Sequence, residues 1–81
     1  MLILFTKPHC HKCDYVKEYI TDAMKPQFKF YDATSDEGKK LLGEMELLEV
    51  ASTSMPILID EEGNVYDGAI ECRKFLETRS S

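Results

Sequence analysis

A pair of cysteines between a short apolar segment and a helical pattern constrains this chain more than any other feature. The apolar segment is Leu2-Ile3-Leu4-Phe5, and the polar loop after it leads to Cys10-His11-Lys12-Cys13. Residues i and i+3 at the start of a helix share one face and lie about 5–6 Å apart, which permits a disulfide. The free N–H groups and partial positive charge of a helix N-terminus also favour a thiolate over a thiol. The pattern predicts a redox-active dithiol on a strand–helix turn.

Length and composition narrow the class of protein further. With 81 residues the chain forms a single domain, residues 1–81, and 43% hydrophobic residues allow a core without metal or disulfide staples. The net charge of -5 argues against a nucleic-acid-binding protein, which normally shows a basic face. Of the 3 cysteines, Cys72 is far from the other two, unlike the dense, even set of a secreted disulfide scaffold.

No segment of the sequence suggests a targeting peptide or a membrane span. The apolar run 2–5 is too short for the apolar region of a signal peptide. No run approaches the roughly 20 apolar residues that a membrane span needs. We therefore expect a cytoplasmic protein, monomeric, without nucleic-acid or membrane partners.

Four segments carry strand patterns. Residues 2–5 are continuously apolar, as in a strand buried on both faces. In Gln27 to Asp32, Phe28 and Phe30 alternate with more polar residues, which also indicates a strand. Residues 57–59 form a further apolar strand after Pro56, and a hairpin turn at 61–64 leads into an edge strand at 65–66.

Three segments carry helical patterns, which gives the order β-α-β-α-β-β-α. The first runs from Cys13 until Lys25-Pro26 ends it, with apolar residues at helical spacing. The second begins at a capping box with Thr34 as the capping residue and runs to about Leu47. Residues 50–55 read as an irregular loop rich in Ser and Thr, and a last helix follows Gly68. The side chains expected to face the core from the last two helices are Leu41, Leu42, Met45, Ala69, Cys72, Phe75 and Leu76.

Taken together, these features resemble the glutaredoxins of the thioredoxin fold. The shared features are a strand, C-x-x-C at a helix start, Met55-Pro56 before the third strand, a hairpin, a glycine and a final helix. The short length also resembles the glutaredoxin-like hydrogen donors of ribonucleotide reductase. The resemblance covers nearly the whole chain and implies an α/β thioredoxin fold, with a four-stranded mixed sheet and three helices.

The resemblance implies a two-step thiol–disulfide exchange. Cys10 is expected to be the nucleophilic thiolate that forms a mixed disulfide with the substrate, and Cys13 to resolve it. The family proline before the third strand is cis, so a cis Met55–Pro56 bond is expected beside the dithiol. The Met55 backbone would then pair with an extended substrate in the manner of a strand.

The resemblance also implies a set of substrate-binding positions around the dithiol. Lys7 precedes Cys10 by three residues, where a family lysine lies near the sulfur and the glutathione carboxylate. Glu71 falls near the family's acidic residue for the glutathione amine. The residues expected to contact the substrate are Lys7, His11, Lys12, Ser54, Met55, Pro56, Gly68 and Ala69.

The chain departs from the glutathione-binding pattern at several points. Asp67-Gly68-Ala69 replaces the family's Gly-Gly pair, and no arginine precedes Met55. Tyr66-Asp67-Gly68 resembles the aromatic-x-Gly of the ribonucleotide-reductase donors, which thioredoxin reductase reduces. His11-Lys12 replaces the common Pro-Tyr or Pro-Val, and positive charge there favours the Cys10 thiolate. Both glutathione and thioredoxin reductase remain possible reductants, and no bound cofactor is expected.

The sequence predicts a thiol–disulfide oxidoreductase that reduces protein or glutathione mixed disulfides, serves cell redox homeostasis and donates electrons to a reductase such as ribonucleotide reductase. Two other classes stay open: a carrier of a metal or of an iron–sulfur cluster shared between two copies, and a redox-inert thioredoxin-fold binding module. Zinc accepts Cys and His ligands, but His9 and His11 are the only histidines and no second cysteine pair exists. Cys72 is expected to pack near the core as a small hydrophobe.

Overall fold

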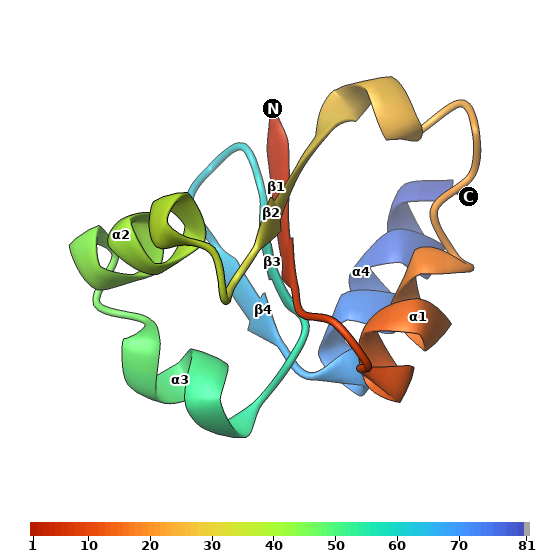
Figure 1. Ribbon diagram of the computed structural model, residues 1–81. Coiled ribbons are helices and arrows are strands. Elements are labelled where there is room, and N and C mark those ends of the chain that lie inside the picture. The colour runs from red at the N-terminus through yellow and green to blue at the C-terminus, as the bar shows by residue number, and fades with distance from the viewer. Residues whose placement is uncertain (81) are drawn as a thin grey trace.

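The computed structural model describes residues 1–80, with side chains through Arg79, as one four-stranded sheet with helices on both faces (Figure 1). Helices α1 and α4 lie on one side of the sheet, and α2 and α3 lie on the other. The elements in chain order are β1 (Leu2–Thr6), α1 (His11–Lys17), the 3₁₀ turn η1 (Lys25–Gln27), β2 (Phe28–Asp32), α2 (Asp36–Glu44), α3 (Leu48–Thr53), β3 (Ile57–Ile59), β4 (Val65–Asp67) and α4 (Ala69–Ser80).

The sheet has the strand order β2-β1-β3-β4, so β1 is a central strand. Strands β1 and β2 are parallel, whereas β3 is antiparallel to both β1 and β4. Leu4 of β1 stands opposite Phe30 on one side and Leu58 on the other. This mixed sheet confirms the fold class expected from the sequence.

The central strand supplies side chains to two separate cores, because successive residues of a strand point to opposite faces. Leu2 and Leu4 pack toward α1 and α4, whereas Ile3 and Phe5 pack toward α2 and α3. The first core consists of Leu2, Leu4, Val16, Ile20, Met24, Phe28, Leu58, Cys72 and Leu76. The second consists of Phe5, Cys10, Cys13, Leu42, Met55, Ile57 and Ile59. Full burial of such an aliphatic or aromatic side chain contributes about 1.5–3 kcal/mol.

The expectation of three helices is wrong, because α3 occupies most of the segment predicted as an irregular loop. Helix α2 ends in a Schellman motif, in which the Leu47 N–H donates to the Leu42 carbonyl over 2.8 Å and the Glu46 N–H to the Gly43 carbonyl over 3.1 Å. The left-handed residue of this motif is Glu46, with φ 59°, rather than the usual glycine. A separate helix therefore begins at Leu48, although no glycine in the sequence marks the boundary between α2 and α3.

Polar residues of α3 explain why its sequence resembles a loop. Ser52 donates its hydroxyl to the Glu49 carbonyl over 2.7 Å, and Thr53 donates to the same carbonyl over 3.3 Å. These hydroxyls donate to a carbonyl of the preceding helical turn and leave the helix intact, which is a known arrangement for Ser and Thr inside helices.

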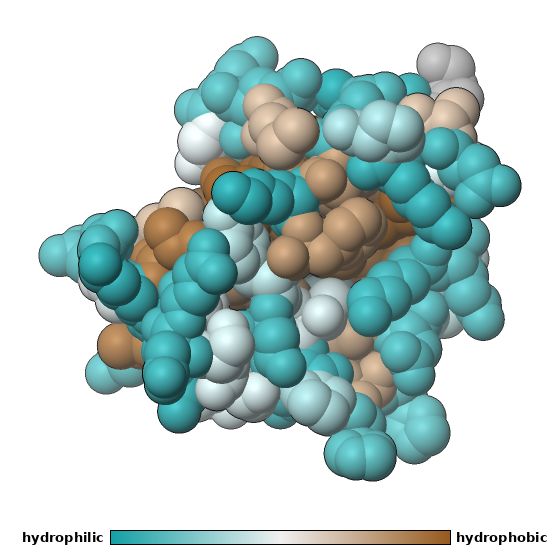
Figure 2. Space-filling model, turned by 45° about the horizontal axis from the view of Figure 1, so that its top comes forward, coloured by the Kyte–Doolittle hydropathy of each residue, from teal (hydrophilic) through white to brown (hydrophobic). Residues whose placement is uncertain are grey.

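The first helix is shorter than predicted, ending at Lys17 rather than near Lys25. Ile20 and Met24 are nevertheless buried, because the turns after α1 still direct both side chains into the first core. The short helix leaves part of β2 uncovered, and Phe30 is 45% exposed beside a cavity of about 330 Å³ that Lys17, Ile20 and Lys25 also line. On the face that Figure 2 shows, apolar side chains gather in a central hollow and hydrophilic side chains surround it.

Two further details differ from the sequence predictions. Ser35, not Thr34, caps α2, since its hydroxyl accepts the Gly38 N–H over 3.0 Å. The Thr34 hydroxyl is already used, because it donates to the Asp32 carboxylate over 2.6 Å. Met45 is 36% exposed rather than in the core, because α2 ends one residue before it.

No helix within residues 1–80 is both long enough and apolar enough to cross a membrane.

The two glycines of α2 should respond oppositely to substitution by alanine. A Cβ at Gly38 would collide with the Asp32 backbone carbonyl, so Gly38→Ala should lower the free energy of unfolding by about 1–3 kcal/mol. A Cβ at Gly43 would meet only Leu48 at an ordinary contact distance of 3.6 Å, so Gly43→Ala should raise it by about 0.5–1 kcal/mol. Urea unfolding of both variants tests the packing of α2 on the β2–α2 turn. Equal effects at the two positions would contradict it.

Candidate active site

Cys10 lies where the chain leaves β1 and enters α1. His9 turns the chain with φ 55°, in the left-handed region where histidine is more tolerated than most residues. Cys10 is then extended, with φ -115° and ψ 106°, and acts as the cap of α1. Its Sγ accepts the Cys13 backbone N–H over 3.1 Å, so the sulfur takes the place of a Ser or Asp capping oxygen. Sulfur at this position faces the donors and partial positive charge that stabilise a thiolate.

Cys10 and Cys13 are joined as a disulfide, with their Cα atoms 5.2 Å apart. The two sulfurs differ in access to solvent, since Cys10 is 8% exposed and Cys13 is 1% exposed. Both belong to the second core, in contact with apolar side chains from β1, α2 and β3. An incoming sulfur can therefore reach Cys10 more readily than Cys13.

The segment before β3 passes beside the disulfide. The predicted cis bond between Met55 and Pro56 is confirmed. Ser54 ends α3 in an extended conformation, and Met55 is buried in the same core as the two cysteines. Within residues 1–80, no hydrogen bond joins the Met55 backbone N–H or carbonyl to another residue. The two Met55 backbone groups are thus free to pair with an extended molecule.

The start of α4 is tied to the same segment by hydrogen bonds to the Pro56 carbonyl. The Gly68 N–H donates to this oxygen over 3.0 Å, and the Cys72 thiol lies 3.5 Å from it and 3.4 Å from the Tyr66 carbonyl. Gly68 has φ 86°, a conformation that strains any residue with a Cβ. Figure 1 shows the start of α1, the segment before β3 and the start of α4 meeting at the same end of the sheet.

Cys72 is fully buried, which confirms its expected place in the core. Burial raises the pKa of the Cys72 thiol to about 12, because the thiolate would lose its solvation. Cys72 therefore stays a neutral thiol at physiological pH and does not compete with the Cys10–Cys13 pair.

Four of the expected substrate-binding residues line two separate cavities. Lys12, Gly68 and Ala69 line a cavity of about 370 Å³, together with Asp67, Ile70 and Glu71. Lys7 lines a different cavity between α2 and α3. His11 is exposed at the first position of α1 and lines neither of them.

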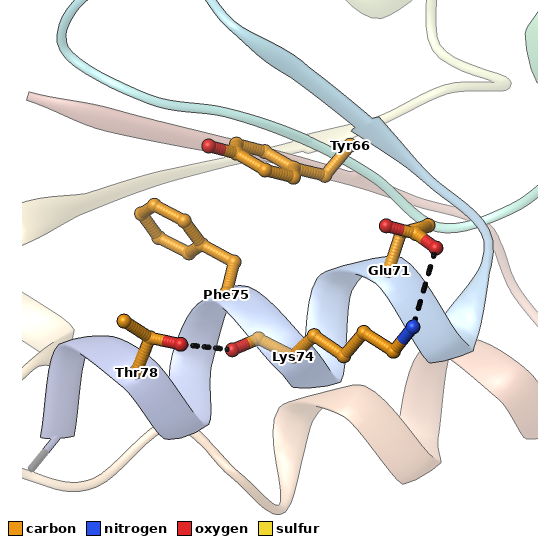
Figure 3. A pocket seen from close by; sticks show the side chains of 5 residues that line it. All are labelled: Tyr66, Glu71, Lys74, Phe75 and Thr78. Carbon is orange, nitrogen blue, oxygen red and sulfur yellow. Dashed lines mark hydrogen bonds and ion pairs between the residues drawn. The ribbon is translucent and has the colours of Figure 1, made fainter.

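Glu71 is paired along its own helix. Its carboxylate points toward the Lys74 ammonium at 3.9 Å, and both residues line a smaller cavity together with the Tyr66 and Phe75 rings (Figure 3). Both charged side chains are more than half exposed, and such ion pairs contribute at most about 1 kcal/mol. The pairing is weak enough for Glu71 to turn toward a ligand in the cavity near Lys12.

Sequence reasoning missed Ile70 in this region. Ile70 is 61% exposed and lines the cavity beside Lys12, so it offers an apolar surface near the disulfide. The helical spacing could have identified Ile70 as exposed, because this residue lies off the buried face formed by Ala69, Cys72 and Leu76.

Within residues 1–80, no group of three or more His, Cys, Asp or Glu side chains is arranged to hold a metal ion.

No family model matches this chain, and no curated protein matches it. A solved structure does match, namely that of the Northeast Structural Genomics target protein XcR50 from X. campestris, with a TM-score of 0.60. The two chains are 23% identical, and the match covers 96% of this chain and 97% of that one. The likeness and the mixed sheet together show a thioredoxin-like fold. In this fold the Cys10–Cys13 pair fits a C-x-x-C motif and is compatible with a redox function.

Gly68→Ala and Gly63→Ala should distinguish a loss of folding stability from a change in the reactivity of Cys10. Both glycines have positive φ, 86° and 87°, and neither has atoms within 4 Å of an added Cβ. Each substitution should therefore cost about 1–2 kcal/mol through backbone strain alone. Only Gly68→Ala should also slow disulfide exchange at Cys10, because only Gly68 bonds to Pro56. Urea unfolding and alkylation rates of the reduced protein measure the two effects. Equal alkylation rates for Cys10 in both variants would contradict a role for Gly68 at the site.

Cys72 should give the oxidised protein a distinct loss of stability at high pH. Its thiol has a pKa of about 12 when folded, whereas an unfolded thiol has a pKa of about 8.5. Above that pH the unfolded state releases the proton and the folded state keeps it, so the free energy of unfolding falls. The fall should approach about 1.4 kcal/mol per pH unit. Urea unfolding from pH 8 to pH 10.5 should show a steeper decline for the parent than for Cys72→Ala. Parallel declines would show that Cys72 ionises normally.

Proposed function

We propose that this protein is a thiol–disulfide oxidoreductase that reduces protein or glutathione mixed disulfides through Cys10 and Cys13. The observation that carries the proposal is the unequal access of two bonded cysteines at the end of β1, beside an unpaired Met55 backbone. In a thioredoxin-like fold, a more accessible Cys10 next to a more buried Cys13 favours a two-step thiol–disulfide exchange. Cys10 reacts with the substrate first, and Cys13 reacts second. The proposed role includes donating electrons to a reductase such as ribonucleotide reductase.

The proposed reaction transfers two electrons from the dithiol to the substrate. In the reduced protein the Cys10 thiolate attacks one sulfur of the substrate disulfide. A mixed disulfide forms, and the other substrate sulfur leaves as a thiolate that takes up a proton. Cys13 then loses its proton and attacks the Cys10 sulfur. The Cys10–Cys13 disulfide forms, and the second substrate sulfur leaves and is protonated.

Residues around the disulfide would bind and orient the substrate. The free N–H and carbonyl of Met55 would pair with an extended backbone, which holds the substrate sulfur in line with Cys10. Ser54 and Pro56 would shape this strand-like site on either side of Met55. Lys12, exposed near the start of α1, would add positive charge near the Cys10 thiolate, and His11 is exposed beside it.

An external dithiol or thiol must return the oxidised protein to the dithiol form. Two molecules of glutathione would do so, giving glutathione disulfide, and thioredoxin reductase is the alternative. Glutathione is supported by charge, because Lys7 and Glu71 line two different cavities and offer partners for a carboxylate and an amine. Rates of reduction by glutathione with glutathione reductase, and by thioredoxin reductase, would distinguish the two.

Substitution of each cysteine by serine tests the order of the steps. Cys10→Ser should abolish reduction of any disulfide, because Cys13 is too buried to attack a substrate. Cys13→Ser should accumulate a mixed disulfide on Cys10, since nothing resolves it. Mass spectrometry with peptide mapping after brief exposure of the reduced protein to glutathione disulfide detects the adducts.

The matched control is Cys72→Ala, which should react as the parent does. Full activity in Cys10→Ser would show that the nucleophile is wrongly assigned. A parent protein whose cysteines form no adduct and no Cys10–Cys13 disulfide would be a redox-inert binding module. A metal or cluster retained on purification, seen by absorbance and metal assay, would favour a carrier.

A further inference from the structure

The cavity between α2, α3 and the loop after β1, which Lys7 lines, contains further residues with no role in the reaction proposed above. Its volume is about 330 Å³. Cavities of this size lie at the lower end of the range for ligand sites and take one or two side chains rather than a cofactor. The residues that line it are Lys7, Ala33, Thr34, Lys39, Leu42, Leu48, Ala51 and Ser52. We name these residues the α2–α3 subsite.

The α2–α3 subsite adjoins the core that contains the disulfide. Leu42 belongs to the buried core that contains Cys10, Cys13 and Met55, and Ala51 packs against the same core. Lys7 precedes Cys10 by three residues along the chain. A substrate held at Cys10 and extended past Met55 would therefore bring its neighbouring residues to this cavity.

The charge of the subsite is opposite to that of the whole chain. Lys7 and Lys39 are exposed, and neither forms an ion pair with another residue among 1–80. No carboxylate lines the cavity, although the chain carries a net charge of -5. Two unpaired cations on an acidic protein form a local positive site that attracts an anionic group.

The subsite also offers apolar surface. Leu42 is 1% exposed and closes the inner end of the cavity, whereas Leu48 is 52% exposed and stands at its side. Leu48 sits at the first position of α3, so this helix creates the apolar wall. A free inorganic anion would leave that wall in water, whereas an acidic side chain next to an apolar one would cover it.

We propose that the α2–α3 subsite binds a segment of the substrate protein in which an acidic residue adjoins an apolar residue near the reactive cysteine. This inference rests on the proposed oxidoreductase function and names the substrate class for it. Lys39 and Lys7 attract the carboxylate, and Leu48 packs against the apolar neighbour. Charge complementarity of this kind selects partners and speeds their encounter.

Peptide disulfides that differ only beside the cysteine test the proposal. The acidic peptide carries Asp-Leu and the basic peptide carries Lys-Leu, and kcat/KM is measured for both with each variant. The parent should prefer the acidic peptide by about three- to tenfold, and high salt should reduce this preference. Lys39→Glu should abolish or reverse the ratio. Lys40→Glu makes the same charge change at the neighbouring exposed position outside the cavity and should keep the ratio within about twofold of the parent.

A second pair of variants tests the apolar wall. Leu48→Ser should lower kcat/KM for the Asp-Leu peptide relative to an Asp-Ser peptide by about threefold, whereas Val65→Ser, at an exposed residue of β4, should leave this comparison unchanged. Both positions are exposed, so neither substitution should unfold the protein.

Reduction of a small uncharged disulfide, oxidised 2-mercaptoethanol, separates the possible failures. A parent protein that reduces this disulfide but treats acidic and basic peptides alike would overturn the subsite and leave the oxidoreductase function standing. A parent protein that reduces no disulfide would overturn both. Equal changes of the ratio in Lys39→Glu and Lys40→Glu would show a general charge effect and overturn the subsite. Self-association that Lys39→Glu abolishes, measured by sedimentation, would assign the surface to a second copy and also overturn the proposal.

Discussion

Burial of β1 on both faces is the constraint on which the rest of the structure depends. Leu2, Leu4 and Phe5 are fully buried, and they point alternately into two different cores. A strand that is apolar on both sides needs a helical layer on each side, which is why α1 and α4 cover one face and α2 and α3 the other. The chain emerges from between these layers at the end of β1, and Cys10 lies there. Loops beyond the carboxyl ends of strands are common positions for functional sites in open α/β sheets.

The candidate site is held by contacts between segments that are distant along the chain. The Pro56 carbonyl accepts the Gly68 N–H and lies against the Cys72 thiol, so the segment before β3 and the start of α4 hold each other in place. Met55 then packs on the cysteine pair in the same core. Burial keeps Cys72 a neutral thiol, so the proposed thiol–disulfide exchange depends on Cys10 and Cys13.

The residue pattern predicted the cysteine pair and the buried Cys72, and the family resemblance implied the cis Met55–Pro56 bond and the mixed sheet. Prediction failed where the chain reverses without the residues usual at such turns. Glu46 occupies the left-handed position where a helix end normally has glycine, so the boundary between α2 and α3 carried no recognisable signal. The apolar spacing of Ile20 and Met24 indicated burial correctly, yet it did not show that the helix had already ended. Periodicity reports which side chains face the core, and turns as well as helices can direct them there.

By itself, the sequence determined the local features of this protein: two cysteines three residues apart at a helix start, and a strand that must be buried on both faces. These depend on backbone geometry over a few residues, so spacing alone predicts them. Only the tertiary structure decided that Lys39 lies with Lys7 beside an apolar cavity, and that Lys12 shares another with Gly68. Residues far apart in the chain meet according to sheet register and the faces that helices bury, and these are set by the packing of the whole domain.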